Sequence, residues 1–424
     1  MMFRRVILKS ILLVSIIGFS LSLHANQYTS IGNGNWSNVL IWSPFGFPLP
    51  TDTVVINSNV TLDSDWGITG AGIITINTGA TLTEDIPGRV FFQAGGDLIN
   101  NGTFNFSNFW LDSGQVYNND SARFDQNFFI DEAGIFINNG VIANVDSAWN
   151  NGVFSNADPN SELICAFFYN TDSLFNDGSI GFLEGANEGV LENMGLIASV
   201  AFINDGEFEN GIGGSFSAVD FWNDWKFVNL GNASVTVTRD FLNGDTLVPL
   251  SGPMLYNDGS FNVGRHFYNG DSIIGVTGQF CIGEYSLNYG YVGGSIDICD
   301  NTGSPSFDTN LGFVGPSVTS CASSCSMVVS VVENDVTCSG GTDGSVVLSV
   351  YGGSGSYTYL WNTGDSTDSI GGLTEGTYVV LITDGIDTSY VVANLKAPSV
   401  LYTINATTES TCDAENGTAA VTAF

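Results

Sequence analysis

Basic side chains are scarce in this sequence. Its 424 residues contain 9 Lys and Arg against 43 Asp and Glu, which gives a formal net charge of −34 at pH 7. Such a surface repels phosphate polymers, and the Lys/Arg clusters that bind DNA or RNA are missing. We therefore expect no nucleic-acid partner and no anionic-membrane partner. The acidic excess is compatible with divalent-cation binding and equally with plain solubility.

Histidine is also nearly absent. His24 lies in the N-terminal segment described below, which leaves His266 as the one base for any Ser-His-Asp or Cys-His system. His266 lies next to a turn, between Arg265 and Phe267, and we interpret it as structural. The sequence contains no Gly-x-Ser-x-Gly elbow, no P-loop and no His-Glu-x-x-His motif.

Long apolar runs are missing too, with one exception at the N-terminus. Three basic residues among the first nine precede an apolar run over residues 11–23, which ends in Leu23-His24-Ala25. This order is typical of a secretory signal peptide. The run is short for an uncleaved membrane anchor, which needs about 20 apolar residues. We predict a signal peptide at residues 1–25, no transmembrane segment in the mature chain, and an extracellular or cell-surface location.

Removal of residues 1–25 leaves all 43 acidic residues and six basic ones, a net charge of −37. The six are Arg89, Arg123, Lys226, Arg239, Arg265 and Lys396. The mature chain is nevertheless no disordered polyanion. Hydrophobic residues make up 43% of the sequence and charged ones 12%, so enough apolar surface is present for a long core.

One short phrase returns from about residue 90 to residue 300. An apolar or aromatic pair precedes Asn-x-Gly, as in Phe202-Ile203-Asn204-Asp205-Gly206, and another short apolar stretch follows. Because Asn and Gly tolerate positive φ, we interpret each phrase as a sharp reversal between short strands. Apolar residues do not recur at helical spacing, so the chain is predicted to be all-β. The phrase glycines are Gly102, Gly140, Gly152, Gly178, Gly195, Gly206, Gly231 and Gly259.

Two architectures fit such phrases, namely a parallel β-solenoid and a series of hairpins in sandwiches. We favour a solenoid, similar to a right-handed β-helix, over residues 26–302. Stacked Asn side chains can hydrogen-bond along a solenoid, and loops of unequal length explain why the glycines are 11 to 38 residues apart. A hairpin array predicts more even spacing.

The entry segment contains a Trp-Ser pair, a Pro turn, an Asp and two short apolar stretches. It includes Trp36-Ser37, Trp42-Ser43-Pro44 and a strand-like stretch at residues 53–56. This resembles the lead-in of many exported bacterial β-helix proteins. The resemblance implies that Trp36 and Trp42 cap the open end of the solenoid, which otherwise exposes unpaired backbone. The alternative is a Trp-rich core corner.

The composition changes at residues 303–326, a stretch rich in Ser, Gly and Cys that we interpret as a linker. Short strands with turn signals every 8–12 residues follow and predict an immunoglobulin-like β-sandwich at residues 327–398. Three motifs occur there in order: Cys338-x-Gly-Gly-x-x-Gly, Gly352-Gly-Ser-Gly-x-Tyr-x-Tyr-x-Trp-x-x-Gly and Leu373-x-x-Gly-x-Tyr-x-Val. Together they resemble the SprB-type repeat of gliding-motility surface adhesins, which implies a surface protein.

One feature departs from the pattern of such repeats, and another extends it. The turn at residues 384–388 lacks the second Cys with which such repeats usually close. A second copy begins in residues 399–424, because Thr411-Cys412 and the following residues echo those from Thr337-Cys338. We interpret it as the start of a second, truncated repeat in a longer array.

Export favours disulfides over metal thiolates for the seven cysteines. Four of them cluster near the end of the solenoid with spacings that match no common zinc module, and we predict two disulfides there. These four are Cys281, Cys299, Cys321 and Cys325. Cys165 is interpreted as a buried free thiol, and the partners of Cys338 and Cys412 stay open.

We expect no cofactor and assign no catalytic, cofactor-binding or metal residue. Calcium remains open, because turn acids of the sandwich supply oxygen atoms of the kind that it binds, although solvated turns are the simpler interpretation. These acids are Asp365, Asp368, Asp384 and Asp387.

The sequence therefore predicts a non-enzymatic adhesin-like protein that binds surfaces, polysaccharide or other cells; it specifies neither the ligand nor the oligomeric state. The alternative is a secreted polysaccharide-degrading enzyme, a β-helix hydrolase or lyase with the sandwich as accessory module. Glycoside hydrolysis needs two carboxyl groups at a set separation, for which Asp220, Asp224 and Asp240 are candidates. A groove with two acids and several aromatic residues favours the enzyme, and acids spread evenly over the solenoid favour the adhesin.

Overall fold

The computed structural model describes residues 26–244, 254–300, 307–320, 325, 327–338, 340–353, 356–385, 388–397, 403–408 and 418–423. The predicted signal peptide at residues 1–25 lies outside this range and stays a prediction. Within it, the chain is all-β apart from the short 3-10 helix η3 (Val39–Ile41). No helix in these residues is long and apolar enough to cross a membrane.

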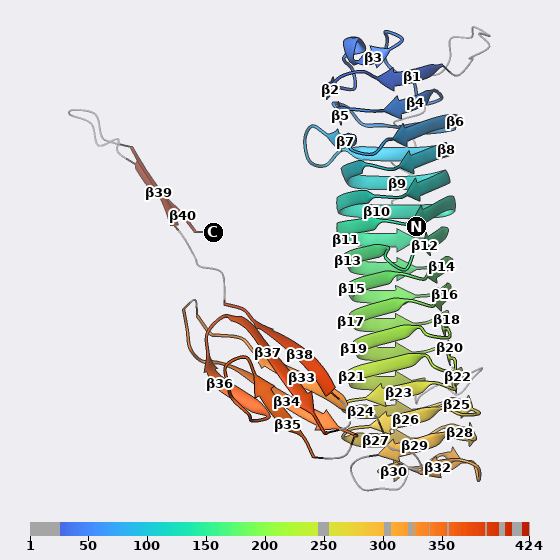
Figure 1. The fold of residues 1–424 in the computed structure, drawn as a ribbon, viewed down its shortest axis with the longest axis vertical. Coiled ribbons are helices and arrows are strands. Elements are labelled where there is room, and N and C mark those ends of the chain that lie inside the picture. Colours follow the sequence, from blue (N-terminus) through green and yellow to red (C-terminus); the bar gives the residue numbers. More distant parts are fainter. Residues whose placement is uncertain are drawn as a thin grey trace.

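Strands β1 to β32 form one continuous β-solenoid of about 13 turns, as the sequence predicts (Figure 1). Its first half comprises β1 (Gln27–Ser30), β2 (Gly34–Asn35), β3 (Trp42–Ser43), β4 (Thr53–Ile56), β5 (Asn59–Leu62), β6 (Trp66–Ile76), β7 (Thr81–Glu84), β8 (Val90–Asn100), β9 (Thr103–Asn118), β10 (Ser121–Asn138), β11 (Val141–Asn150), β12 (Val153–Asn156), β13 (Glu162–Asn170), β14 (Ser173–Asn176), β15 (Ser179–Asn187) and β16 (Val190–Asn193). Its second half comprises β17 (Leu196–Asn204), β18 (Glu207–Asn210), β19 (Ser215–Asn223), β20 (Lys226–Asn229), β21 (Ser234–Asn243), β22 (Met254–Asn257), β23 (Ser260–Val263), β24 (His266–Asn269), β25 (Ser272–Gly275), β26 (Gln279–Ile282), β27 (Tyr285–Asn288), β28 (Tyr291–Gly294), β29 (Asp297–Asp300), β30 (Thr309–Asn310), β31 (Phe313–Val314) and β32 (Thr319–Ser320).

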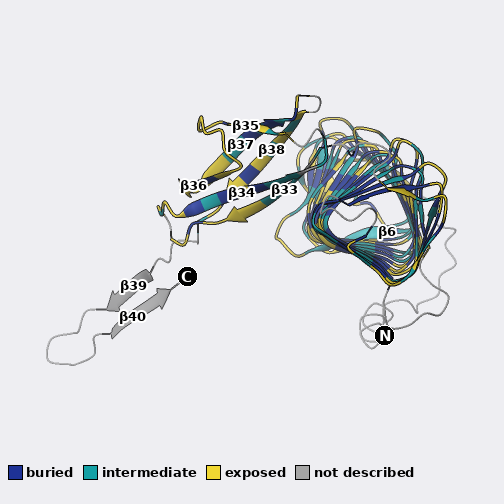
Figure 2. Ribbon diagram, turned by 90° about the horizontal axis from the view of Figure 1, so that it is seen from below, coloured by how far each residue is buried: buried dark blue, intermediate teal, exposed yellow. Residues whose placement is uncertain are grey.

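Strands of successive turns pair in parallel, so the turns superimpose in a view along the solenoid axis (Figure 2). Alternate side chains of each strand point inward, and one continuous apolar core fills the interior. One of the three strand columns, called face C below, contains β24, β27 and the second halves of β11, β13, β15, β17, β19 and β21. In the upper turns, face C continues through residues 127–130, 108–111 and 90–93.

Two ladders of asparagines, all of them buried except the terminal Asn310, run along the solenoid, which confirms the predicted Asn stacking. In each ladder, the side-chain amide of one Asn donates to the side-chain oxygen of the Asn one turn further on. The distance from Asn187 Nδ2 to Asn204 Oδ1 and that from Asn204 Nδ2 to Asn223 Oδ1 are both 2.8 Å. Chains of such bonds satisfy amides that would otherwise be unpaired in the core. One ladder is Asn150, Asn170, Asn187, Asn204, Asn223, Asn243, Asn269, Asn288 and Asn310. The other is Asn100, Asn118, Asn138, Asn156, Asn176, Asn193, Asn210, Asn229 and Asn257.

The glycines of the Asn-x-Gly phrases serve a different purpose from the predicted one. None of the eight has a φ in the left-handed region, so the explanation from positive φ is wrong. In seven of them, a Cβ atom would lie within 2.4 Å of a backbone carbonyl oxygen, as in Gly206, where it would meet the Gly189 oxygen at 2.2 Å. The turns stack so closely that no side chain fits between them. Gly231 is the exception, with no atom within 4 Å.

The N-terminal end is closed by tryptophans. The ring centroids of Trp36 and Trp42 are 4.9 Å apart and those of Trp36 and Trp66 are 4.3 Å apart, and both Trp36 and Trp42 are buried. Strand β3 folds back antiparallel onto β1 at this end (Figure 1). This arrangement fits the capping role predicted from the entry segment.

The solenoid extends beyond the boundary predicted at residue 302. Strands β30, β31 and β32 add a further turn, paired in parallel with β27, β28 and β29. Part of the predicted linker at residues 303–326 is therefore solenoid. Its Ser- and Gly-rich composition is typical of a linker, but backbone ladder bonds do not depend on side-chain type, which is why composition misplaced the boundary.

The C-terminal module is a small sandwich, which agrees with the predicted repeat at residues 327–398. One antiparallel sheet contains β33 (Val328–Asn334), β34 (Gly344–Tyr351) and β36 (Ser369–Leu373); the other contains β35 (Thr358–Trp361), β37 (Gly376–Thr383) and β38 (Thr388–Leu395). Both sheets contribute to one core, including Val346, Trp361 and Val380. After it, β39 (Thr403–Thr408) and β40 (Thr418–Ala423) pair antiparallel, as β33 and β34 do.

Candidate functional site

A row of outward-facing aromatic side chains runs along face C. Parallel pairing aligns one residue per turn in five successive turns, each flanked by inward-facing neighbours. The five are Phe92, Trp110, Phe129, Trp149 and Tyr169, called the aromatic row below. The same position then holds Ala186, Ile203, Trp222, Leu242, Tyr268 and Leu287.

Three of the four neighbouring pairs of rings in the aromatic row contact each other. Ring centroids are 6.4 Å apart for Phe92 and Trp110, 5.0 Å for Trp110 and Phe129, and 5.2 Å for Trp149 and Tyr169. Phe92 and Trp110 are 36% and 37% exposed, and the other three are partly buried. The upper turns of face C therefore present a nearly continuous aromatic strip to solvent.

A second outward row lies beside the first, two residues earlier in each strand. Along the five upper turns it contains Val90, Asn108, Asn127, Ser147 and Phe167, none of which is charged. The side-chain amide of Asn127 donates to Asn108 Oδ1 at 2.7 Å. Along the lower turns this second row instead contains Asp220, Asp240, His266 and Tyr285.

The lower turns of face C form a hollow of about 480 Å³, called the Asp220 hollow below. Its lining residues are Asp220, Trp222, Arg239, Asp240, Phe241, Leu242, Tyr268, Leu287 and Tyr289. The structure thus brings together two of the three candidate acids, Asp220 and Asp240, which are direct neighbours on paired strands. Asp224 does not line this hollow; it follows the ladder residue Asn223 at the corner of the turn.

Charges in the Asp220 hollow are largely paired. The Arg239 guanidinium donates from Nε to Asp220 Oδ1 at 2.7 Å and contacts the other oxygen through Nη2, and it lies 3.9 Å from Asp240 Oδ2. The hydrogen bond to Asp220 raises the pKa of Arg239. His266 Nδ1 lies 2.8 Å from Asp240 Oδ1, close enough for an ion pair when the imidazole is protonated. His266, interpreted from sequence as structural, thus lies beside a candidate acid.

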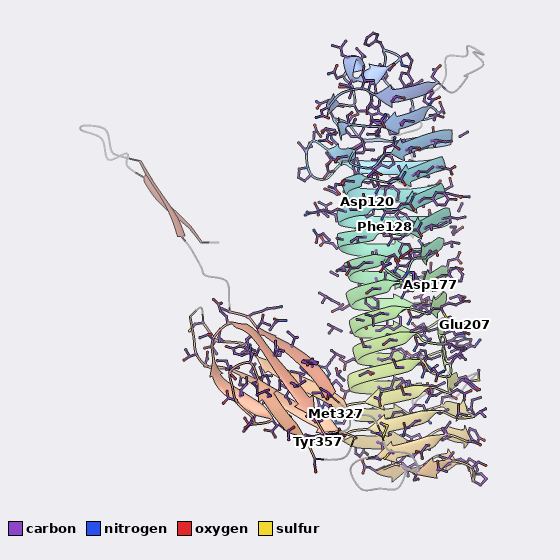
Figure 3. The ribbon with its side chains drawn as sticks, in the orientation of Figure 1. Asp120, Phe128, Asp177, Glu207, Met327 and Tyr357 are labelled. Carbon is purple, nitrogen blue, oxygen red and sulfur yellow. A yellow bond between two sulfur atoms is a disulfide. The ribbon has the colours of Figure 1, made fainter. Side chains whose placement is uncertain are left out.

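Acidic side chains elsewhere are spread over the outside of the solenoid. Asp120, Asp177 and Glu207 are exposed in different turns, whereas Phe128 is buried in the core (Figure 3). In the sandwich, Asp365 accepts a hydrogen bond from Thr363 at 2.7 Å and Asp368 one from Ser369 at 3.1 Å. Asp387 lies outside the described residues. The described part of the chain contains no group of three or more His, Cys, Asp and Glu side chains arranged to hold a metal.

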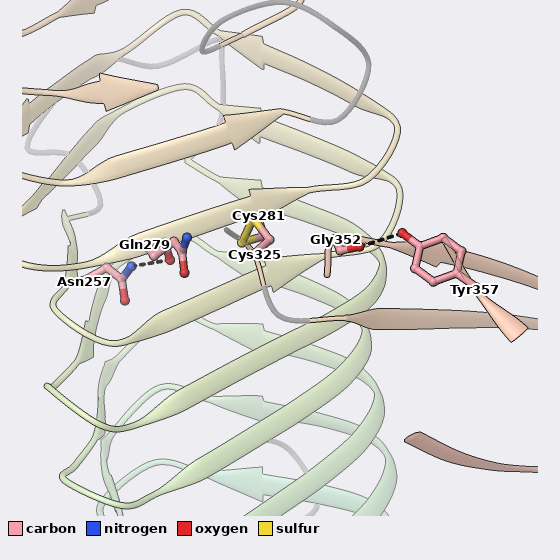
Figure 4. The surroundings of a disulfide bond; sticks show 6 residues. All are labelled: Asn257, Gln279, Cys281, Cys325, Gly352 and Tyr357. Carbon is pink, nitrogen blue, oxygen red and sulfur yellow. Dashed lines mark hydrogen bonds between the residues drawn. A yellow bond between two sulfur atoms is a disulfide. The ribbon is translucent and has the colours of Figure 1, made fainter. Parts of the chain in front are cut away.

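A disulfide joins the end of the solenoid to the start of the sandwich. Cys281 in β26 is bonded to Cys325 (Figure 4). Gly353 N donates to Cys325 O at 2.6 Å, and the Tyr357 hydroxyl donates to Gly352 O at 2.6 Å. The sandwich lies beside the lower turns (Figure 1), where β33 contacts β21.

The other cysteines agree in part with the predictions. Cys299 is also disulfide-bonded, whereas Cys321 and Cys412 lie outside the described residues. Cys165 is a buried free thiol, as predicted, and burial raises its pKa to about 12. Cys338 is free and exposed.

A pH-dependent contribution to stability is expected from Asp205. Asp205 is exposed, but partial desolvation and the neighbouring Glu188 raise its pKa, so folding favours its neutral form and the charged form costs stability at neutral pH. Replacement of Asp205 with Asn should therefore stabilise the protein by up to about 1 kcal/mol at pH 7. This gain should disappear as the pH falls below the pKa of Asp205 in both folded and unfolded chains. Urea unfolding at several pH values measures the gain, with Asp177→Asn, at the same position of another Asn-Asp-Gly phrase, as control. A gain that does not depend on pH contradicts the explanation.

Comparison with known families identifies the C-terminal module. Residues 330–366 match the SprB repeat. The SprB repeat covers β34 and β35 and falls inside the predicted repeat at residues 327–398. The chain thus joins a β-solenoid to a C-terminal SprB repeat, as the sequence motifs indicate, and SprB repeats are typical of surface-exposed proteins. Comparisons with curated proteins and with solved structures give no match.

Proposed function

We propose that this protein is a non-enzymatic adhesin, exported to the cell surface or secreted, whose solenoid binds an extracellular surface, glycan or protein. The SprB repeat at residues 330–366 is the observation that carries the proposal. A solenoid with an uninterrupted core is a stiff body, because each turn is packed on its neighbours along the axis. The disulfide from Cys281 to Cys325 couples this body to the repeat, so force applied to the solenoid reaches the repeat.

An adhesin should retain its ligand without cleaving it, and this can be tested directly. The full chain, immobilised on beads, should hold polysaccharide-coated surfaces or cells and release no soluble sugar. Beads coated with a variant lacking residues 26–320 provide the control for the repeat alone. Failure of the full chain to retain every polysaccharide, abiotic surface and cell type contradicts adhesion, and release of new reducing ends contradicts the non-enzymatic part.

The Asp220 hollow favours a second candidate function, polysaccharide cleavage. It combines two neighbouring carboxylates with Trp222, Tyr268 and Tyr289, which is the pattern expected of a sugar-cleaving groove. Against this, Arg239 lies between the two acids and binds Asp220 through two contacts, so a substrate would have to compete with an existing ion pair.

Substitution in this hollow separates the two functions. Under the adhesin proposal, wild type and Asp240→Asn are both expected to release no reducing ends from any polysaccharide. The matched control is Asp224→Asn, which changes an acid outside the hollow. Release by wild type and by the control, with loss of at least 100-fold in Asp240→Asn, establishes the enzyme in place of the adhesin.

A further inference from the structure

We propose that the aromatic row is a docking track for one neutral, linear polysaccharide chain that lies along the solenoid axis. This inference rests on the proposed function and names the ligand class of the adhesin. It concerns Phe92, Trp110, Phe129, Trp149 and Tyr169, all in the upper turns of face C.

The fold does not require aromatic residues in this row. The same outward position holds Ala186, Ile203 and Leu242 further down, in turns with equally complete ladders. Five aromatic side chains in consecutive turns therefore add exposed apolar surface without a structural need. Contiguous apolar surface of this kind on a soluble protein typically marks a binding site.

The dimensions of the row fit a sugar chain better than a protein partner. Four strand spacings of about 4.8 Å give a strip about 19 Å long and one side chain wide. Phe92 and Trp110 are about a third exposed and the other three rings less, so the five rings together offer at most on the order of 350 Å². A standard protein interface buries about 800 Å² per partner. A single polysaccharide chain needs only a narrow strip, on which the C–H faces of its sugar rings pack against aromatic rings.

The polar neighbours of the row are suited to sugar hydroxyl groups. Asn108, Asn127 and Ser147 line the strip on one side and provide both donors and acceptors. Asn127 and Asn108 already bond to each other, so their orientation is defined before a ligand arrives. Pre-ordered side chains lose less entropy on binding.

Charge selects a neutral ligand over an acidic one. Exposed carboxylates flank the strip, among them Asp112, Asp125 and Asp146. The nearby cations are already paired: Arg123 forms an ion pair with Asp125, and Arg89, which precedes the segment that contains Phe92, forms ion pairs with Asp85 and Asp65. Together with a net charge of −34, this environment repels uronic-acid polymers, sulfated glycans and nucleic acids.

The experiment measures binding of soluble neutral glucans, mannans and xylans to the full chain by affinity electrophoresis and calorimetry, with alginate and polygalacturonate as acidic probes. Trp110→Ala and Trp149→Ala should each weaken binding of the retained neutral polymer at least 10-fold, and Trp110→Phe should restore most of it. Trp225→Ala, which removes an exposed tryptophan outside both the aromatic row and the Asp220 hollow, should bind as wild type. Binding should change little between low and high salt, and thermal unfolding should verify that all variants are folded.

Several outcomes overturn the inference. Equal binding by wild type and Trp110→Ala, or tighter binding of acidic polymers, places the ligand elsewhere. Self-association of the wild type that is lost in Trp110→Ala assigns the strip to a second copy of the chain. Retention on surfaces or cells without binding of any neutral polysaccharide defeats this inference and leaves the adhesin proposal standing, whereas absence of both defeats both.

Discussion

Replacement of Gly206 with Ala is expected to destabilise the solenoid by about 3–5 kcal/mol, whereas the same change at Gly231 should shift stability by less than about 1 kcal/mol. The Cβ added at Gly206 would lie 2.2 Å from the Gly189 carbonyl oxygen in the preceding turn. Backbone cannot move aside there without breaking ladder hydrogen bonds. At Gly231 no atom lies within 4 Å of the added Cβ.

The pair is a matched comparison, because both glycines close an Asn-x-Gly phrase. Chemical unfolding followed by circular dichroism gives the free energy of unfolding for each variant. Because solenoid turns contact only their neighbours, hydrogen exchange should locate the weakening of Gly206→Ala in the turns of β16 to β19. Equal losses at the two positions would show that the phrase needs glycine for its backbone conformation after all.

Replacement of Asn204 with Asp should cost about 3–5 kcal/mol at neutral pH. Asn204 is fully buried, and its amide donates to Asn223 Oδ1 at 2.8 Å and to Lys226 O at 3.0 Å. A carboxylate cannot donate to either oxygen and repels both. Burial favours the neutral acid, which regains one donor, so the loss should shrink as the pH falls through the raised pKa of the new carboxyl.

The matched control is Asn139→Asp. Asn139 also donates to an Asn one turn away, Asn119, at 2.8 Å, but it does so on the exposed surface. Water replaces a lost surface bond, so the change should cost less than about 1 kcal/mol and depend little on pH. Unfolding free energies of both variants between pH 4 and pH 8 test the argument; similar losses would mean that burial of the ladder contributes little.

The Asn-x-Gly phrase predicted the solenoid and the Asn ladders, yet the reason assigned to its glycines was wrong. The sequence shows which residues repeat, whereas the cause of the repetition is contact between turns. Gly206 and Gly231 occupy the same place in the phrase, and only the distance to the neighbouring turn distinguishes them. Composition also placed the end of the solenoid too early, because the short strands β30 to β32 are recognised by their pairing with β27 to β29 and not by their residue types.

The aromatic row was not predicted from the sequence, although the sequence contains a signal for it. In each of its five turns, the aromatic residue directly precedes an inward-facing residue, as in Trp149-Asn150 and Tyr169-Asn170. The residues are 18 to 20 positions apart, a spacing that becomes meaningful only once these turns are aligned. The Asp220 hollow could not be located from the sequence for the same reason. Asp240 and His266 are 26 residues apart in the chain, yet they pair directly on neighbouring strands.

The sequence by itself determined the all-β class, the stacking of turns through asparagine, and the SprB repeat, because each depends on local residue patterns. Tertiary structure decided which outward side chains share a row and which glycines are indispensable. The physical reason is the variable length of the turns. Consecutive ladder asparagines are 17 residues apart between Asn176 and Asn193 but 28 apart between Asn229 and Asn257. Loops absorb this difference, so neighbours on face C are defined by backbone pairing and not by distance along the chain.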